Sequence, residues 1–277
     1  MRLGAPVPRT SDPQQWIVTL REKGYSAAYC PLDETADDAT VAAFARAAAD
    51  ADIVVAEVPA FGNNPISPDD AICRAALEKC QQKLALADRL GARCCVNVAG
   101  SRQPVRGPHA ENFAPATFDL IVESVRQIVD AVRPTSTFYT LETMPWIFPD
   151  SADSYLALLR AIDRPRFAVH LDPVNLVCSP QRYYHNADLL RECFAKLGPY
   201  VKSCHGKDTV LENRLTAHLS EARPGTGGLD YRVFLTELDQ LDPDTPLMLE
   251  HLPSQEEYSL AAEHVRAVAR QAGVDIV

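Results

Sequence analysis

The run FAVHLD at residues 167–172 decides the fold class, because it is a short apolar segment rich in strand-forming residues that ends on a carboxylate. Similar runs recur along the chain, and longer amphipathic segments separate them. This alternation is typical of repeated strand–helix units around a parallel sheet. We therefore expect strands at 2–7, 26–30, 52–58, 93–98, 137–142, 167–172, 200–205 and 246–250.

Helices are expected in the segments between these strands. The first begins at Asp12 and Pro13, a capping residue followed by proline at the first helical position. The others are expected at 37–51, 68–90, 115–132, 153–162, 187–197, 231–238 and 254–272. Eight strand–helix pairs in 277 residues predict an α/β fold, a (β/α)8 TIM barrel. No linker rich in Gly, Ser or Pro divides the chain, so one TIM-barrel domain is expected over residues 1–277.

The charge and hydropathy of the sequence limit the kinds of molecule that the protein is expected to bind. The formal net charge is −10 and the sequence pI is near 5.2. Lys and Arg are scattered, so no basic stripe is expected to bind a nucleic acid. No stretch has the roughly 18 apolar residues that span a bilayer, and the first residues lack the apolar core of a signal peptide. We expect a cytoplasmic protein with no membrane partner.

The long connections all follow strands. They lie at 61–67, 100–114, 143–152, 173–186 and 206–230. In a barrel, the loops after strands share the C-terminal rim, where active sites of this architecture are built. Loop length therefore predicts a functional site at that rim.

The last four expected strands end in TLETMPW (140–146), VHLDPVN (169–175), KSCHGKD (202–208) and MLEHLP (248–253). Each ending carries one possible metal ligand: Glu142, Asp172, His205 and Glu250. Three carboxylates packed together would repel one another unless a cation lay among them. An oxygen-rich set with one imidazole favours Mn²⁺, and Mg²⁺, Co²⁺ or Zn²⁺ are alternatives.

Alternation along the strands assigns further side chains to the inside of the barrel. Side chains two apart share a face, so His170 accompanies Asp172 and Ser203 accompanies His205. We expect the inward face to be polar only near the rim. His170 is expected either as a packed core histidine or as a group that orients a carboxylate or binds a substrate hydroxyl.

Other residues at the same rim are candidates for substrate binding. Lys207 shares a face with His205 and can reach a substrate oxygen, although a solvated lysine is an equal alternative. Trp146 can form an apolar platform for a sugar ring or simply pack. Glu57 and Asn97 are expected to reach hydroxyls from the ends of the third and fourth strands. The glycines of residues 225–228 predict a turn rather than a phosphate-binding loop, because no GK(S/T) follows them.

These endings resemble the xylose-isomerase-like superfamily of sugar isomerases and epimerases, especially the branch of D-tagatose 3-epimerase, hydroxypyruvate isomerase and inosose dehydratase. The markers are LE at Glu142, HLD at Asp172, HGKD at His205, PGTGGLDY at 224–231 and LE at Glu250. The resemblance implies one Mn²⁺-like ion held by those four residues. It also implies that Glu142 and Glu250 act as acid and base on opposite sides of the substrate.

Two departures bear on the substrate. The epimerases often carry a histidine three residues after the metal aspartate, where this chain has Asn175. They also carry an arginine soon after the metal histidine, where the nearest residue here is Arg214. Hydroxyl recognition by Asn175 and Arg214 is therefore expected to differ from that of the ketohexose epimerases.

The expected function is a divalent-metal-dependent isomerase or epimerase of a sugar or sugar-like hydroxy-carbonyl compound, acting by glutamate-mediated proton transfer through a metal-stabilised enediolate. The main alternative is a metal-dependent dehydratase or lyase that acts on a keto-sugar, keto-glycoside or inosose. A non-catalytic sugar-binding barrel and an apurinic endonuclease are weaker alternatives. The expected partner is a small carbohydrate-like molecule. The sequence does not decide whether the chain forms a homo-oligomer.

Overall fold

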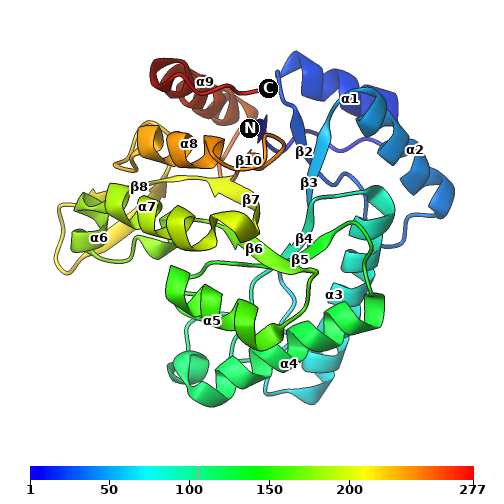
Figure 1. Ribbon diagram of the computed structural model, residues 1–277, viewed down its shortest axis with the longest axis vertical. Coiled ribbons are helices and arrows are strands. Elements are labelled where there is room, and N and C mark those ends of the chain that lie inside the picture. The colour runs from blue at the N-terminus through cyan, green and yellow to red at the C-terminus, as the bar shows by residue number, and fades with distance from the viewer. Residues whose placement is uncertain (105) are drawn as a thin grey trace.

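A closed barrel of parallel strands forms the centre of the computed structural model, which describes residues 1–104 and 106–277 (Figure 1). The strand order around the barrel is β1-β10-β7-β6-β5-β4-β3-β2, and pairing of Arg2 with Pro246 closes the ring. All eight expected strands are present and the TIM barrel is confirmed. Their bounds are β1 (Arg2–Gly4), β2 (Ala27–Tyr29), β3 (Val54–Pro59), β4 (Cys94–Asn97), β5 (Phe138–Glu142), β6 (Phe167–Leu171), β7 (Val201–Gly206) and β10 (Pro246–Leu249).

Helices surround the barrel on the outside (Figure 1). They are α1 (Pro13–Glu22), α2 (Asp38–Asp50), α3 (Asp70–Leu90), α4 (Pro115–Val132), α5 (Ala152–Ile162), α6 (Pro180–Tyr184), α7 (Asn186–Leu197), α8 (Tyr231–Asp239) and α9 (Gln255–Ala272), with single 3₁₀ turns η1 (Ala110–Phe113), η2 (Val174–Leu176) and η3 (Gly198–Tyr200). None of these helices in the described part of the chain is long and apolar enough to cross a bilayer.

Local chemistry fixes where the helices begin and end. The Asp12 side chain accepts a hydrogen bond from Gln14 N, and proline stands at the first helical position of α1, as the sequence predicts. Asp69 caps α3 in the same way, and Gly91 ends it with φ 73°. These caps satisfy backbone groups that a helix end leaves without partners.

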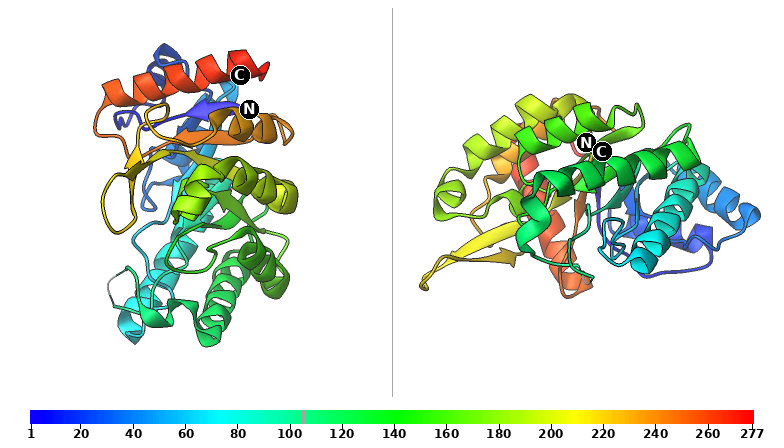
Figure 2. Two further views of the ribbon diagram at one scale, coloured as in Figure 1. Left: turned by 90° about the vertical axis from the view of Figure 1, so that its left-hand side faces the viewer. Right: turned by 90° about the horizontal axis from the view of Figure 1, so that it is seen from below.

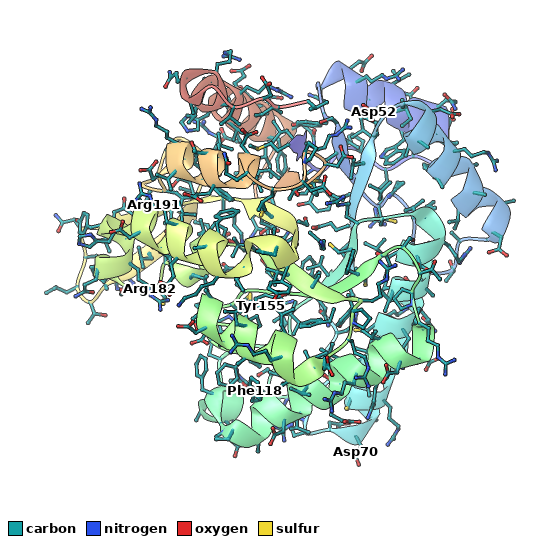
Figure 3. The ribbon with its side chains drawn as sticks, viewed as in Figure 1. Asp52, Asp70, Phe118, Tyr155, Arg182 and Arg191 are labelled. Atoms are coloured by element: carbon teal, nitrogen blue, oxygen red, sulfur yellow. The ribbon has the colours of Figure 1, made fainter. Side chains whose placement is uncertain are left out.

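A tyrosine from α5 joins the two strands that carry Glu142 and lead to Asp172. Tyr155 is fully buried, and its hydroxyl lies 2.5 Å from Leu141 O and 3.0 Å from Ala168 O, both of which can accept its proton (Figure 3). The same oxygen accepts from Leu141 N at 3.1 Å and His170 N at 3.3 Å. Tyr155 therefore holds β5 and β6 together next to the strand ends.

Both apolar and polar side chains fill the inside of the barrel, and His170 and Ser203 lie there as the alternation predicts. A small apolar cluster of Ala27, Ala56 and Met248 packs there, beside Tyr29. Glu57, His170 and Ser203 are fully buried inside as well. The polar side chains lie directly beneath the rim carboxylates, where Ser203 Oγ donates to Glu57 Oε2 and Glu57 Oε1 contacts His205 Nε2.

The connection at 206–230 contains structure that the sequence did not predict. Strands β8 (Asp208–Glu212) and β9 (His218–Ala222) form an antiparallel hairpin that projects from the barrel, drawn in yellow in Figure 2. The helix α6 lies within the connection at 173–186, also expected as a loop. Both segments were missed because they are short and few of their side chains are buried.

Candidate metal centre and active site

Four ligand side chains meet at the carboxyl ends of the strands. Glu142 ends β5, Asp172 follows β6, His205 lies on β7 and Glu250 follows β10. One ligand atom from each lies within 4.8 Å of the others. Asp172 and His205 are fully buried, while Glu142 and Glu250 keep 6% and 8% of their surface exposed. The barrel thus brings the four residues into one cluster that opens slightly to solvent.

The carboxylate oxygens of this cluster fit a divalent cation. Asp172 Oδ2 and Glu250 Oε1 are buried, and neither accepts a hydrogen bond of suitable geometry from the described residues. Lys207 Nζ lies 2.8 Å from each of them, although the angles do not suit a hydrogen bond. Burial raises the pKa of Asp172 to about 7, because a charged carboxylate is poorly solvated there. A cation among three such oxygens and an imidazole would remove this penalty, so the donor set suits a divalent metal.

The two nitrogens of His205 face different groups. Nδ1 lies 2.8 Å from Glu250 Oε1 and 3.2 Å from Glu142 Oε1, so it faces the carboxylate cluster. Nε2 lies 3.2 Å from Glu57 Oε1. A nitrogen that binds a metal carries no proton, so binding through Nδ1 requires the proton on Nε2, where it donates to Glu57.

Glu57 therefore lies beneath the ligand cluster rather than at its mouth. The sequence assigned it to a substrate hydroxyl, but the residue is fully buried and its second oxygen accepts from Ser203 Oγ at 3.2 Å. Burial raises the pKa of Glu57, and the nearby imidazole of His205 opposes this change. The contacts are those of a residue that orients a ligand.

His170 lies beside His205 with ring centroids 4.1 Å apart and planes nearly perpendicular. It has no exposed surface, and its Nδ1 lies 3.5 Å from Glu57 Oε2, although neither ring nitrogen makes a hydrogen bond of suitable geometry with the described residues. Burial lowers the pKa of His170 well below its usual value, so the ring is neutral. Its position suits packing against His205 more than contact with a substrate.

Two of the expected substrate-binding residues do lie at the mouth. Asn175 Nδ2 donates to Glu142 Oε1 at 3.2 Å and to Thr143 O at 3.1 Å. Lys207 is almost fully buried and also contacts Glu221 Oε1 at 2.9 Å. Both line a cavity of about 200 Å³ above the ligand cluster, which we call the central cavity.

Three expected residues are not brought to this cavity. Asn97 is fully buried, and its amide nitrogen contacts Cys80 Sγ and Asn63 O at 3.4 Å. Trp146 is half-buried and packs against the apolar core outside the barrel. Arg214 lies in the exposed turn between β8 and β9 and pairs with Glu212 at 3.3 Å.

Besides Phe61, Arg106 and Met144, which also line the central cavity, sequence reasoning missed Glu221 and His251. Glu221 on β9 contacts both Lys207 and His251 Nδ1 at 2.9 Å. His251 adopts φ 58°, and its Nε2 lies 3.5 Å from Glu250 Oε2. Glu221 could be assigned only from the hairpin and His251 only from this backbone turn, and the residue pattern reveals neither feature.

The glycine-rich segment serves the structure. Asp208 Oδ2 accepts from Gly225 N and Gly227 N at 3.0 Å, and Asp208 Oδ1 accepts from Leu229 N at 2.9 Å. A Cβ atom at Gly227 would lie 2.4 Å from Asp208 Oδ1. The glycine thus lets the chain wrap a carboxylate next to Lys207, which supports the prediction of a turn.

Comparison with known proteins shows to which family the chain belongs. The sequence description of the xylose isomerase-like TIM barrel matches residues 19–268, which is most of the chain. The chain belongs to this family. No curated protein sequence matches it significantly.

Solved structures of this family share the fold at low identity. A xylose isomerase-like TIM barrel protein from Mycobacterium smegmatis, in complex with magnesium, is 18% identical with a TM-score of 0.67 over 94% of this chain and 88% of that one. Endonuclease IV from Thermus thermophilus is 15% identical with a TM-score of 0.77 over 98% and 100%. D-psicose 3-epimerase from Clostridium cellulolyticum, with D-tagatose, is 14% identical with a TM-score of 0.70 over 99% and 100%.

Proposed function

We propose that the protein is a divalent-metal-dependent isomerase or epimerase of a sugar or sugar-like hydroxy-carbonyl compound. The observation that carries this proposal is the buried cluster of Glu142, Asp172, His205 and Glu250 at the active-site end of the barrel. These three carboxylates and one imidazole would hold a divalent ion that also binds substrate oxygens, and Mn²⁺ is the first choice for such a donor set.

Each ligand has a role of its own in this proposal. Asp172 and His205 are fully buried, so they hold the ion. Glu142 and Glu250 keep some exposure and line the central cavity, so their carboxylates can reach the carbon acid of a bound substrate. When bound, the ion supplies polarisation of the carbonyl and its adjacent hydroxyl, which acidifies the C–H between them.

Proton transfer by two glutamates then defines the product. One carboxylate removes the proton from the carbon, and the other returns a proton. Return to the opposite face of the same carbon gives an epimer. Return to the neighbouring carbon, with transfer of the hydroxyl proton to the former carbonyl oxygen, gives an aldose–ketose isomer. Lys207 contributes by donating a hydrogen bond to a substrate oxygen, since its ammonium lies beside both Asp172 and Glu250.

A dehydratase is the second candidate, and the position of Lys207 supports it as well. An ammonium 2.8 Å from Glu250 Oε1 can protonate a hydroxyl that leaves from the β-carbon. A nucleic-acid substrate is disfavoured by the net charge of −10 and by a ligand cluster with a single imidazole.

The test is solvent exchange in D₂O with the metal-loaded protein and a panel of ketoses, keto-acids and inososes. We expect deuterium at the carbon next to the carbonyl and its loss in Glu142→Gln and Glu250→Gln, with metal content measured in each variant. Loss of water from the substrate would select the dehydratase. If metal-loaded protein exchanges no compound of the panel, the proposal fails.

A further inference from the structure

A second cavity, of about 310 Å³, lies beside the central cavity, and we call it the side cavity. It lies between the β8–β9 hairpin on one side and the segment after β6 on the other. Because the hairpin projects from the barrel (Figure 2), the side cavity extends the site outward along the hairpin.

One face of the hairpin forms the first wall. Ala217, Leu219 and Glu221 all line the side cavity. They lie two residues apart, with Leu219 and Glu221 on β9 and Ala217 directly before it. Side chains with this spacing share a face of a strand. Thr209, which pairs with Glu221 across the hairpin, lines the side cavity too. Ser220 lies on the opposite face and is exposed.

The opposite wall is apolar and well packed. Val174 and Val177 line the side cavity and are 6% and 4% exposed, so they are fixed by the core behind them. Pro145, from the connection after β5, also lines it. A rigid apolar wall is suited to an uncharged apolar group.

Two residues connect the side cavity to the metal-ligand cluster. Asn175 and Glu221 line both the side cavity and the central cavity. Asn175 bonds Glu142 at 3.2 Å, and Glu221 contacts Lys207 at 2.9 Å. A molecule that reacts at the cluster can therefore extend past these two side chains into the side cavity.

Polarity falls with distance from the cluster. Along β9 the lining changes from Glu221 to Leu219 and then to Ala217. Among the described residues that line the side cavity there is no Lys or Arg, so a phosphate group would find no counter-charge. The central cavity of about 200 Å³ is small compared with ligand sites of roughly 300–1,000 Å³.

We propose that the side cavity binds an uncharged apolar substituent, aromatic or alkyl, carried by the hydroxy-carbonyl substrate whose reacting end lies at Glu142 and Glu250. The substrate class is thus a hydroxy-carbonyl compound whose apolar appendage occupies the side cavity. This inference rests on the proposed function for the reacting end alone, and its test depends on binding rather than turnover.

The test compares two probes that share one hydroxyketone group. Hydroxyacetone carries a methyl group and 2-hydroxyacetophenone carries a phenyl group in its place. Their affinities for the Mg²⁺-loaded protein are measured by ligand-observed NMR titration. Burial of the phenyl ring should make 2-hydroxyacetophenone bind about tenfold or more tightly than hydroxyacetone.

Variants of β9 locate the effect. Leu219→Arg should abolish the preference for the phenyl probe, and Leu219→Ala, which keeps the strand neutral, should reduce it several-fold. Ser220→Arg is the matched control, because it adds the same charge to the other face and should leave the preference unchanged. The affinity of hydroxyacetone should stay within about twofold throughout.

Equal affinities of the two probes, or a preference that survives both Leu219 variants, would overturn the inference. Exchange of the C–H protons of the probes in D₂O is measured in the same samples. A phenyl preference without exchange would refute the proposed function and leave the side cavity assigned. Exchange without a phenyl preference would support the proposed function and refute the assignment of the side cavity.

Discussion

His205 Nε2 lies 3.2 Å from Glu57 Oε1, inside the barrel and away from the carboxylates that Nδ1 faces. The imidazole thus bridges a buried anchor and the ligand cluster. Such a partner fixes the tautomer and the ring orientation of a metal-binding histidine.

Replacement of this anchor should weaken metal binding. Glu57→Gln keeps the size and one acceptor oxygen but removes the charge that favours the proton on Nε2. We expect the affinity for Mn²⁺ to fall about 10- to 100-fold, measured by isothermal titration calorimetry. Asn97→Asp is a control for a buried change outside the cluster, since Asn97 contacts Cys80 instead. An unchanged Mn²⁺ affinity in Glu57→Gln would refute the anchoring role.

Removal of the Tyr155 hydroxyl should destabilise the barrel. In Tyr155→Phe, the backbone groups of Leu141 and His170 lose a buried partner. The free energy of unfolding should fall by about 1–3 kcal/mol, measured by urea denaturation of the metal-free protein. A difference below about 0.5 kcal/mol would mean that the hydroxyl does not join β5 and β6.

Stability should depend on pH through Glu34. Hydrogen bonds from Lys79 and Lys83 lower the pKa of Glu34 to about 2. Because the pKa of Glu34 is lower in the folded protein than the value of about 4.3 in the unfolded chain, its ionised carboxylate stabilises the fold at pH values above about 4.3. This stabilisation is lost as the pH falls toward 2. Glu34→Gln should therefore destabilise the protein at pH 7, and the difference from wild type should shrink from pH 5 downward. A constant difference between pH 7 and pH 3.5, measured by denaturation, would contradict the assignment, and Glu22→Gln is an exposed control.

Chelation should lower thermal stability. The buried oxygens of Asp172 and Glu250 accept no hydrogen bond of suitable geometry within the described part of the chain, and an ion that binds the folded protein there stabilises it. A metal concentration of 100 times Kd adds about 2.7 kcal/mol. We expect Tm to rise with added Mn²⁺ and to fall with EDTA, in differential scanning fluorimetry. The shift should vanish in Asp172→Asn but persist in Arg214→Ala, whose residue lies in the hairpin turn.

The barrel and the meeting of Glu142, Asp172, His205 and Glu250 in one cluster could be predicted, because both depend on local pattern. Short apolar runs mark the strands, and Glu142 and Glu250 follow them directly. The role of Glu57 could not be predicted, since its contact with His205 spans 148 residues and exists only when the barrel closes. Glu221 was missed for a related reason: the half-exposed side chains of its hairpin give no clear alternation.

Every role proposed for the site depends on one divalent ion held by Glu142, Asp172, His205 and Glu250. Equilibrium dialysis against Mn²⁺, followed by metal analysis, counts the ions bound per chain. We expect one ion per chain in the wild type and almost none in Asp172→Asn and His205→Ala, with folding checked by circular dichroism. Equal Mn²⁺ content in the wild type and in these folded variants would contradict the four-ligand site.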